Sequence, residues 1–275
     1  MASYPVDAPL SIAHLCELEV PPPKLIEMAA AAGLDSVGFR TRPSAAGGIQ
    51  YPLATKVEQA EIRRLTKSTG VGVLYIELVA LDETLRVQDC RPMFEVGAEI
   101  GAKRLTVSGD SSDVSAVAAK LAEVAELAGN YGIAVDLEFM PFRAVKSLAD
   151  AYDVVRRAAH PNAFILVDAL HIFRSNSALE TFRTIDQALI GTFQICDAPE
   201  MAPPADKLVA EARTNRLLPG DGGLALWPLI EALPAAVPIG VEVPMATLHP
   251  GLEPGERLKK LVSATRNFLR KGPSA

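Results

Sequence analysis

Four polar residues in the second half of the chain each end a short apolar run. The runs are Ala134–Glu138, Phe164–Asp168, Thr192–Gln194 and Ile239–Glu242. Each run reads as a buried strand, and an ionised carboxylate there is costly unless something pairs with it. Three carboxylates and an amide that meet at one point would bind a cation, and such oxygen ligands suit Mg²⁺, Mn²⁺ or a similar divalent ion. The residues expected to bind it are Glu138, Asp168, Gln194 and Glu242.

Apolar runs alternate with stretches of helical periodicity along the chain. The runs expected as strands are Ser11–Cys16, Ser36–Arg40, Val71–Glu77, Arg104–Ser108, Ala134–Phe139, Phe164–Asp168, Thr192–Cys196 and Ile239–Val243. The expected helices are Pro23–Ala32, Lys56–Ser68, Val114–Asn130, Ser147–Ala158, Ala225–Leu233 and Pro254–Leu269. Glycines such as Gly33, Gly70 and Gly132 fall where a helix should stop.

Eight strands that alternate with helices predict an α/β fold, a (β/α)₈ barrel, with residues 1–275 as one domain. A doubly wound open sheet is the alternative, and it is weakened because no Gly-rich phosphate motif follows the first strand. Catalytic groups of a barrel stand at the carboxyl ends of its strands, so four consecutive strands can aim their terminal side chains at one place. For each carboxylate alone, the competing interpretation is that it caps a helix or pairs with an arginine.

Composition restricts the partners of the chain. It has 275 residues, of which 49% are hydrophobic, and a net charge of −6 without a basic block, which argues against nucleic acid or a membrane surface as partner. The sequence shows neither a signal peptide nor an apolar run of membrane-spanning length, so we expect a cytoplasmic protein. Cys16, Cys90 and Cys196 lack metal-binding spacing and read as small buried side chains in a reducing compartment. The sequence leaves open whether the chain forms a homo-oligomer.

From about Ser11 to Phe268 the chain resembles the xylose isomerase-like barrels, the sugar phosphate isomerase/epimerase superfamily. The segments that carry the resemblance are Leu137–Phe142, Val167–His171, Phe193–Pro199, Arg216–Gly220 and Val241–Pro244. The resemblance implies one divalent metal ion (Mn, Mg, Co or Zn) on the four strand-end residues. Many epimerases and isomerases of the group have histidine in place of Gln194. In this respect, and in Asp168-x-x-His171, the chain is similar to bacterial 3-dehydroshikimate dehydratases, although the N-terminal half, including the segment 39–42, does not match them.

The chemistry shared by these enzymes is proton abstraction next to a carbonyl that a divalent ion polarises, which gives an enediolate or enolate. Return of the proton to the next carbon gives isomerisation, and return to the opposite face gives epimerisation. Loss of a β-hydroxyl gives dehydration instead. We therefore expect an isomerase or epimerase of a small keto sugar or polyol derivative. The alternatives are a dehydratase (lyase) that acts on a keto acid such as 3-dehydroshikimate and a barrel that binds a ligand without turnover.

Candidate residues follow for catalysis and for substrate binding. His171 stands three residues after Asp168 and titrates near neutral pH, so it is the expected proton-transfer group. The resemblance implies that Glu138 and Glu242 also act as acid and base. Arginine forks bind carboxylate or phosphate, and the expected substrate-binding residues are Arg213, Arg216, Arg40, Arg42 and His14. Asp197 is expected to hold a metal ligand or arginine in place. Phe142 and Trp227 are candidates for the pocket wall, although core packing is the more frequent use of such residues.

Overall fold

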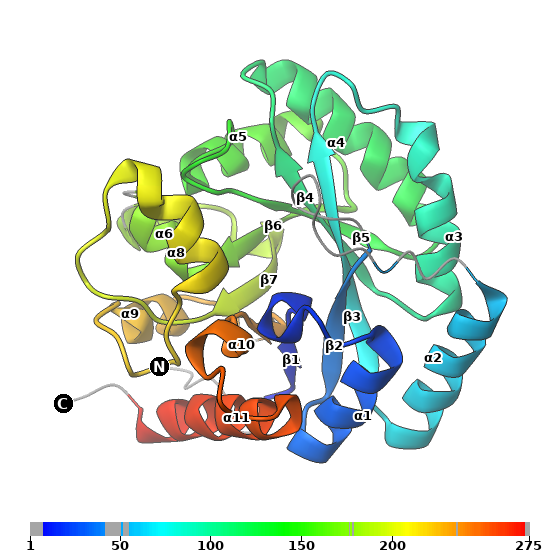
Figure 1. Ribbon diagram of the computed structural model, residues 1–275. Coiled ribbons are helices and arrows are strands. Elements are labelled where there is room, and N and C mark those ends of the chain that lie inside the picture. The colour runs from blue at the N-terminus through cyan, green and yellow to red at the C-terminus, as the bar shows by residue number, and fades with distance from the viewer. Residues whose placement is uncertain are drawn as a thin grey trace.

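The computed structural model describes residues 8–41, 51, 55–175, 177, 179–234 and 236–272. Eight parallel strands form a closed barrel in which each strand pairs with the next and the eighth pairs with the first (Figure 1). The strands are β1 (Leu10–Ile12), β2 (Ser36–Arg40), β3 (Gly72–Leu81), β4 (Arg104–Gly109), β5 (Ala134–Glu138), β6 (Ala163–Asp168), β7 (Ile190–Ile195) and β8 (Ile239–Val241). The predicted (β/α)₈ barrel is confirmed, and the open sheet is excluded.

Helices surround the strands in Figure 1. The longer ones are α1 (Pro22–Ala32), α2 (Lys56–Thr69), α3 (Arg91–Glu99), α4 (Val114–Gly129), α5 (Leu148–Ala158) and α11 (Pro254–Lys271). The short ones are α6 (Ala169–Arg174), α7 (Leu179–Thr184), α8 (Leu208–Thr214), α9 (Leu226–Glu231) and α10 (Met245–Leu248). Single 3₁₀ turns are η1 (His14–Glu17), η2 (Val87–Cys90), η3 (Gln187–Leu189) and η4 (Ala205–Lys207). No helix in the described part of the chain is long and apolar enough to cross a membrane.

Local signals explain where the predicted helices begin and end. A capping box at Thr55 and Glu58 starts α2, because the threonine hydroxyl accepts the Glu58 N–H and the Glu58 carboxylate accepts the Thr55 N–H. Gly33 and Gly70 end α1 and α2 in the left-handed conformation, each with φ of 78°, which glycine adopts without steric cost. These are the glycines at which the sequence predicted a stop.

The first and last strands are shorter than predicted. β1 ends at Ile12, and the expected extension to Cys16 was wrong because the chain turns into η1 at His14. The His14 ring holds this turn, since its Nε2 donates to the Val20 carbonyl (2.9 Å) and its Nδ1 accepts the backbone N–H of the next strand's Arg40 (3.0 Å). β8 ends at Val241, and the N–H of Val243 is donated to the sulfur of Cys16 (3.4 Å) instead of to a neighbouring strand.

The short helices α6, α7, α8 and α10 were not predicted. They have four to seven residues, which is two turns or less and too few to show a hydrophobic period. Three of them, α6, α8 and α10, lie in the segments that follow β6, β7 and β8. The helices in these segments therefore could not be predicted from the sequence alone.

A buried ion pair joins neighbouring strands of the barrel. The Arg104 guanidinium on β4 donates to both carboxylate oxygens of Asp136 on β5, with Nε 2.6 Å from Oδ2, and Thr192 of β7 donates its hydroxyl to the same oxygen at 2.7 Å. Gly191 makes room for this group, because a Cβ there would lie 2.1 Å from the Arg104 and Asp136 side chains. The three strands are thereby held together through one carboxylate.

We expect Asp136→Ala to lower the free energy of unfolding by about 3–5 kcal/mol, because it leaves a largely buried guanidinium without its partner. Asp153→Ala is the control, since Asp153 forms an exposed pair with Arg157 (2.8 Å) one helical turn away, and such a pair contributes less than about 1 kcal/mol. Denaturant unfolding of the two variants measures the difference. Equal losses would show that the Arg104–Asp136 pair does not stabilise the barrel.

Candidate functional site

The four strand-end residues occupy the same end of the barrel. Glu138 and Asp168 are the last residues of β5 and β6, Gln194 is the next to last of β7, and Glu242 follows β8 directly. Asp168 and Gln194 are partners in the strand register. All four side chains are buried, with exposed fractions of 0% for Asp168 and 3% for Gln194. The structure thus brings the four residues to one end, as a closed parallel barrel requires.

One arginine ties two of these carboxylates together. The Arg216 guanidinium is 2% exposed and donates from Nη1 to Asp168 Oδ2 (2.6 Å), while its Nη2 lies 2.7 Å from Glu242 Oε2. Its Nε donates to the carbonyl of Ala212 (2.8 Å). Arg216, expected to bind substrate, lines the pocket, but its donors are used by the protein itself.

Asp168 shows both competing interpretations of a strand-end carboxylate at once. Besides pairing with Arg216, it caps α6, since its Oδ1 accepts the His171 N–H (3.1 Å). Burial alone would raise the pKa of Asp168, but the charge of Arg216, helped by the side chain and N–H of His171, outweighs it and lowers the pKa below its usual value. Asp168 is therefore held ionised by its partners.

The other two carboxylates have less compensation. Burial raises the pKa of Glu138 well above its usual value, and repulsion from Glu242 and Asp168 adds to this. Burial likewise raises the pKa of Glu242 to about 7, although Arg216 acts in the opposite direction. Three buried carboxyl groups thus lie around the Arg216 guanidinium, and the raised pKa values of Glu138 and Glu242 reflect this shortage of positive charge.

The donor set of this site fits a divalent cation. Ligand atoms of Glu138, Asp168 and His171 lie within 4.8 Å of one another. The Gln194 Oε1 is buried and has no hydrogen-bond partner in the described structure, so an acceptor is left over beside these carboxyl groups. Glu242, an expected ligand, is not in that trio and is linked to Asp168 through Arg216. His171, which the sequence analysis expected as a proton-transfer group and not as a ligand, is a member of the trio.

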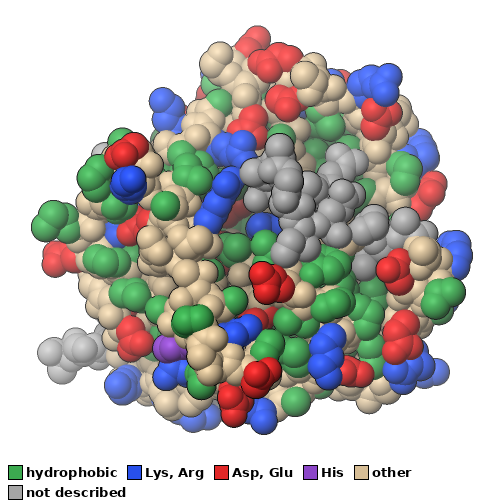
Figure 2. Space-filling model, viewed as in Figure 1, with side chains coloured by type: hydrophobic (Ala, Val, Ile, Leu, Met, Phe, Trp, Pro, Cys, Tyr) green, Lys and Arg blue, Asp and Glu red, His purple; other side chains and the backbone are tan. Residues whose placement is uncertain are grey.

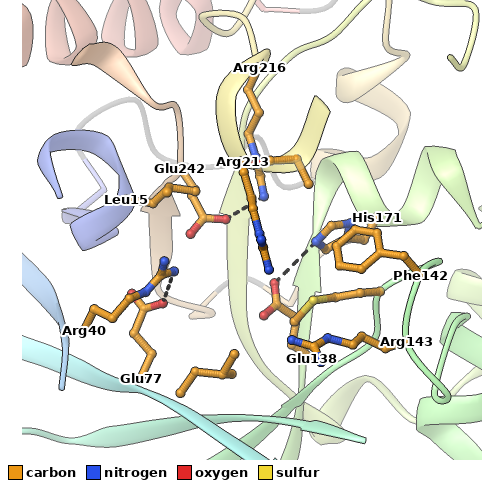
Figure 3. Close-up of a pocket in the computed structure, with 13 residues that line it drawn as sticks. Leu15, Arg40, Glu77, Glu138, Phe142, Arg143, His171, Arg213, Arg216 and Glu242 are labelled. Carbon is orange, nitrogen blue, oxygen red and sulfur yellow. Dashed lines mark hydrogen bonds and ion pairs between the residues drawn. The ribbon is translucent and has the colours of Figure 1, made fainter. Parts of the chain in front are cut away.

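His171 lies beside Glu138 in the pocket. Its Nε2 lies 3.8 Å from Glu138 Oε1, and its Nδ1 is buried without a partner in the described residues. Burial lowers the pKa of His171 to about 4, so the ring is neutral near neutral pH. Phe142, expected to wall the pocket, packs edge-on against the ring at 5.5 Å between centroids. Figure 3 shows the imidazole pointing at the Glu138 carboxylate.

Two expected substrate-binding residues have backbone or side-chain partners. His14 is 0% exposed with both ring nitrogens bonded to backbone, and it is not among the described residues that line the pocket. Arg40 does line the pocket and donates from Nη2 to Glu77 Oε2 (2.9 Å), while its Nε has no partner in the described structure. Arg42 lies outside the described residues.

Basic side chains gather at the rim of the pocket. Arg213 has no hydrogen-bond or ion-pair partner among the described residues, and Arg143 pairs with Asp110 at 3.2 Å. Arg40, Arg143 and Arg213 line the same pocket, and burial lowers the pKa of Arg213, with repulsion from Arg143 and Arg40 acting in the same direction. In Figure 3 they reach the pocket from different sides, and in Figure 2 basic and acidic side chains meet near the centre of the same face.

Asp197 anchors the loop that carries Arg216. Its carboxylate accepts the backbone N–H groups of Ala198, Gly220, Gly222 and Leu224 at 2.8–3.1 Å. Its backbone exchanges two hydrogen bonds with Leu217, the residue after Arg216. These contacts of Asp197 are thus with backbone, rather than with the ligand or arginine expected from the sequence.

The sequence analysis missed three residues of the site region. Glu77 and Arg143 line the pocket, and Tyr75 does not line it but contacts Gln194. The predicted third strand ended at Glu77, and a strand-end position is how the other carboxylates were identified. That predicted end was wrong, because β3 continues to Leu81. Arg143 directly follows the segment Leu137–Phe142 of the family resemblance. Tyr75, in the strand interior, gave no signal.

A family model described as a xylose isomerase-like TIM barrel matches residues 26–271. A comparison with curated protein sequences finds no significant match. Among solved structures, an IOLI protein with bound zinc has a TM-score of 0.81 and 18% identity, over 97% of this chain and 100% of its own.

Two further solved structures represent different activities on this fold. D-Psicose 3-epimerase from Clostridium cellulolyticum H10, solved with D-tagatose, has a TM-score of 0.73 and 16% identity, over 96% of this chain and 98% of its own. The probable 3-DHS dehydratase AsbF from Bacillus anthracis has a TM-score of 0.73 and 14% identity, over 95% and 98%. At such identities these likenesses show the fold alone.

We expect Cys16 and Cys196 to resist alkylation by iodoacetamide at about pH 8 while the chain is folded. Both thiols are fully buried, and burial raises the pKa of Cys196 to about 12, so the reactive thiolate is scarce. Mass spectrometry of the native chain checks this, with the chain unfolded in guanidinium chloride as the control in which all three cysteines react. Rapid labelling of Cys196 in the native chain would contradict the closed packing around Arg216.

Proposed function

Because the chain belongs to the xylose isomerase-like TIM barrel family, we propose that it is a divalent-metal-dependent isomerase or epimerase of a small keto sugar or polyol derivative. The observation that carries the proposal is the close set of ligand atoms from Glu138, Asp168 and His171 at the carboxyl ends of the strands. An IOLI protein of similar fold was solved with zinc, and similar barrels include D-psicose 3-epimerase.

The residues that would hold the ion are Glu138, Asp168, Gln194 and Glu242, with His171 in reach of the first two. When bound, a divalent ion supplies a positive charge that stabilises negative charge developing on a substrate oxygen. The excess of buried carboxylates over buried guanidinium and the unpartnered Gln194 Oε1 support this assignment. Zn, Mn, Mg and Co remain the candidate ions.

The groups that face the pocket would transfer the proton. Glu138 and Glu242 both line it, from β5 and from the end of β8. One carboxylate takes the proton next to the substrate carbonyl, and the other, or the same one, returns it. His171 Nε2 lies 3.8 Å from Glu138 Oε1. A proton can pass between the two side chains if they approach by a fraction of an ångström, or if a substrate hydroxyl bridges them. Arg216 keeps the Glu242 carboxylate fixed during this transfer.

We expect His171→Ala to lower turnover by about 10²–10⁴-fold, the usual contribution of a positioned acid or base, while metal binding stays nearly intact. Glu242→Ala should abolish activity and weaken metal retention. His160→Ala is the matched control, because His160 pairs with Glu126 outside the pocket. Kinetics on the active ketose and calorimetric titration with Mn²⁺ measure both effects. Full activity of His171→Ala would indicate that Glu138 or Glu242 transfers the proton. Loss of metal binding in this variant would indicate that His171 is a metal ligand.

The arginines at the rim favour a second candidate, a dehydratase that acts on a keto acid such as 3-dehydroshikimate. Arg213 has no acidic partner in the described structure and lines the same pocket as Arg143 and Arg40. A carboxylate on the substrate would relieve the repulsion among these cations, and a guanidinium fork suits it. A probable 3-DHS dehydratase has a similar fold. A neutral ketose would leave the same repulsion in place.

A substrate panel of neutral ketoses and 3-dehydroshikimate separates the two candidates. If the substrate is acidic, Arg213→Ala should raise its KM about 10- to 100-fold, since a hydrogen-bonded charged group contributes about 1.5–3 kcal/mol. The exposed Arg64→Ala on α2 serves as the control. An Arg213→Ala variant with unchanged KM for the best substrate would argue against the keto acid. A metal-loaded chain that binds but converts no member of the panel would support a non-catalytic binding barrel.

A further inference from the structure

We propose that Tyr75 is a positioning residue that orients the Gln194 amide so that its oxygen, and not its nitrogen, faces the cation site. This inference rests on the metal-dependent function proposed above. Gln194 Nε2 lies 3.3 Å from the Tyr75 hydroxyl, which accepts its hydrogen bond, and Gln194 Oε1 is left without a partner in the described structure. Tyr75 stands on β3 and Gln194 on β7, so the contact crosses the barrel interior.

A glutamine ligand has a problem that a carboxylate lacks. Only its Oε1 can bind a cation, whereas its NH₂ group has two donors and no acceptor. With the amide reversed, the NH₂ group would face the carboxylates at the strand ends, which attract it electrostatically. The correct orientation instead places the NH₂ group in the buried interior, where a donor without a partner is costly. The Tyr75 hydroxyl is the partner that makes the correct orientation possible.

The barrel makes room for the Tyr75 ring at Gly38. A Cβ at Gly38 on β2 would lie 2.1 Å from Tyr75 Cε2, so no larger residue fits there while the ring keeps its place. Gly38 does not have a positive φ, so the backbone conformation does not require a glycine there. The Tyr75 ring is therefore what excludes a side chain at this position.

The contact between Tyr75 and Gln194 is shielded from water. Tyr75 is 1% exposed and Gln194 is 3% exposed, so the phenol oxygen is the acceptor that the buried Gln194 Nε2 has in place of water.

Tyr75→Phe tests the inference, because it removes the hydroxyl and keeps the ring that fills the interior. We expect its dissociation constant for Mn²⁺, measured by calorimetry, to rise about 10- to 100-fold, the usual effect of losing a group that orients a metal ligand. Tyr131→Phe is the matched control, since the Tyr131 hydroxyl accepts a hydrogen bond from Arg91 on the outer helices. Thermal unfolding of both variants without metal measures any loss of packing.

A double-mutant cycle with Gln194→Glu separates orientation from packing. Both oxygens of a glutamate can bind a cation, so its side chain needs no partner to choose between them. We expect Tyr75→Phe to change the Mn²⁺ affinity of the Gln194→Glu chain by less than about 3-fold, which makes the two positions strongly coupled. The visible spectrum of the Co²⁺-loaded chain, which reports the ligand set, should change on Tyr75→Phe only when Gln194 is present.

The outcomes distinguish this inference from the proposed function. If the unmodified chain binds Mn²⁺ and Tyr75→Phe binds it equally well, Tyr75 does not orient the ligand, and the proposed function is unaffected. If Tyr75→Phe weakens Mn²⁺ binding equally with Gln194 in place and in the Gln194→Glu variant, Tyr75 acts through packing and the inference is overturned. A chain that binds neither Mn²⁺ nor Co²⁺ would overturn both.

Discussion

The Arg216 guanidinium between Asp168 and Glu242 is the interaction on which the geometry of the site depends. It joins the ends of β6 and β8 to the segment after β7, and all three groups are almost fully buried. Without it, three buried carboxylates would stand together with no positive charge in contact, which the barrel could relieve only by protonation or by moving apart. Arg216 therefore allows the carboxylates to be close without cancelling all of their charge, and the remaining negative charge is what a cation would neutralise.

Charge is arranged in two layers around the pocket. The inner layer is acidic, with Glu138, Glu242 and the neighbouring Asp168, while the rim is basic, with Arg143 and Arg213. The buried Arg40 lies deeper and is paired with Glu77. A small hydroxy-ketone with an anionic end would match both layers, because its carbonyl end would meet the acidic, cation-binding layer and its anionic end the arginines. A neutral sugar would match only the inner layer. The rim, and not the inner layer, is thus the part of the site where the two proposed reactions differ.

The sequence predicted the parts of this structure that local patterns determine. β2 has the predicted bounds, Gly33 and Gly70 end their helices, and the strand-end positions of Glu138 and Asp168 follow from the alternation of runs. The turn at His14 was not predictable, because it depends on a hydrogen bond to Arg40, 26 residues away. Nor was the contact between Tyr75 and Gln194, 119 residues apart, since only closure of the barrel brings β3 and β7 within reach of one another.

Arg213 and Arg216 show how one short segment serves both layers. Arg213 is in the last turn of α8, whereas Arg216 lies after the helix has ended at Asn215. The change from helix to extended chain turns the second arginine inward, where the hydrogen bonds of Asp197 to the following loop hold it in place. Because Asp197 secures the loop independently of Arg213, substitution at the rim can alter which substrates enter without disturbing the carboxylates. The segment after β7 is therefore where the specificity of this barrel can change at least cost to its inner site.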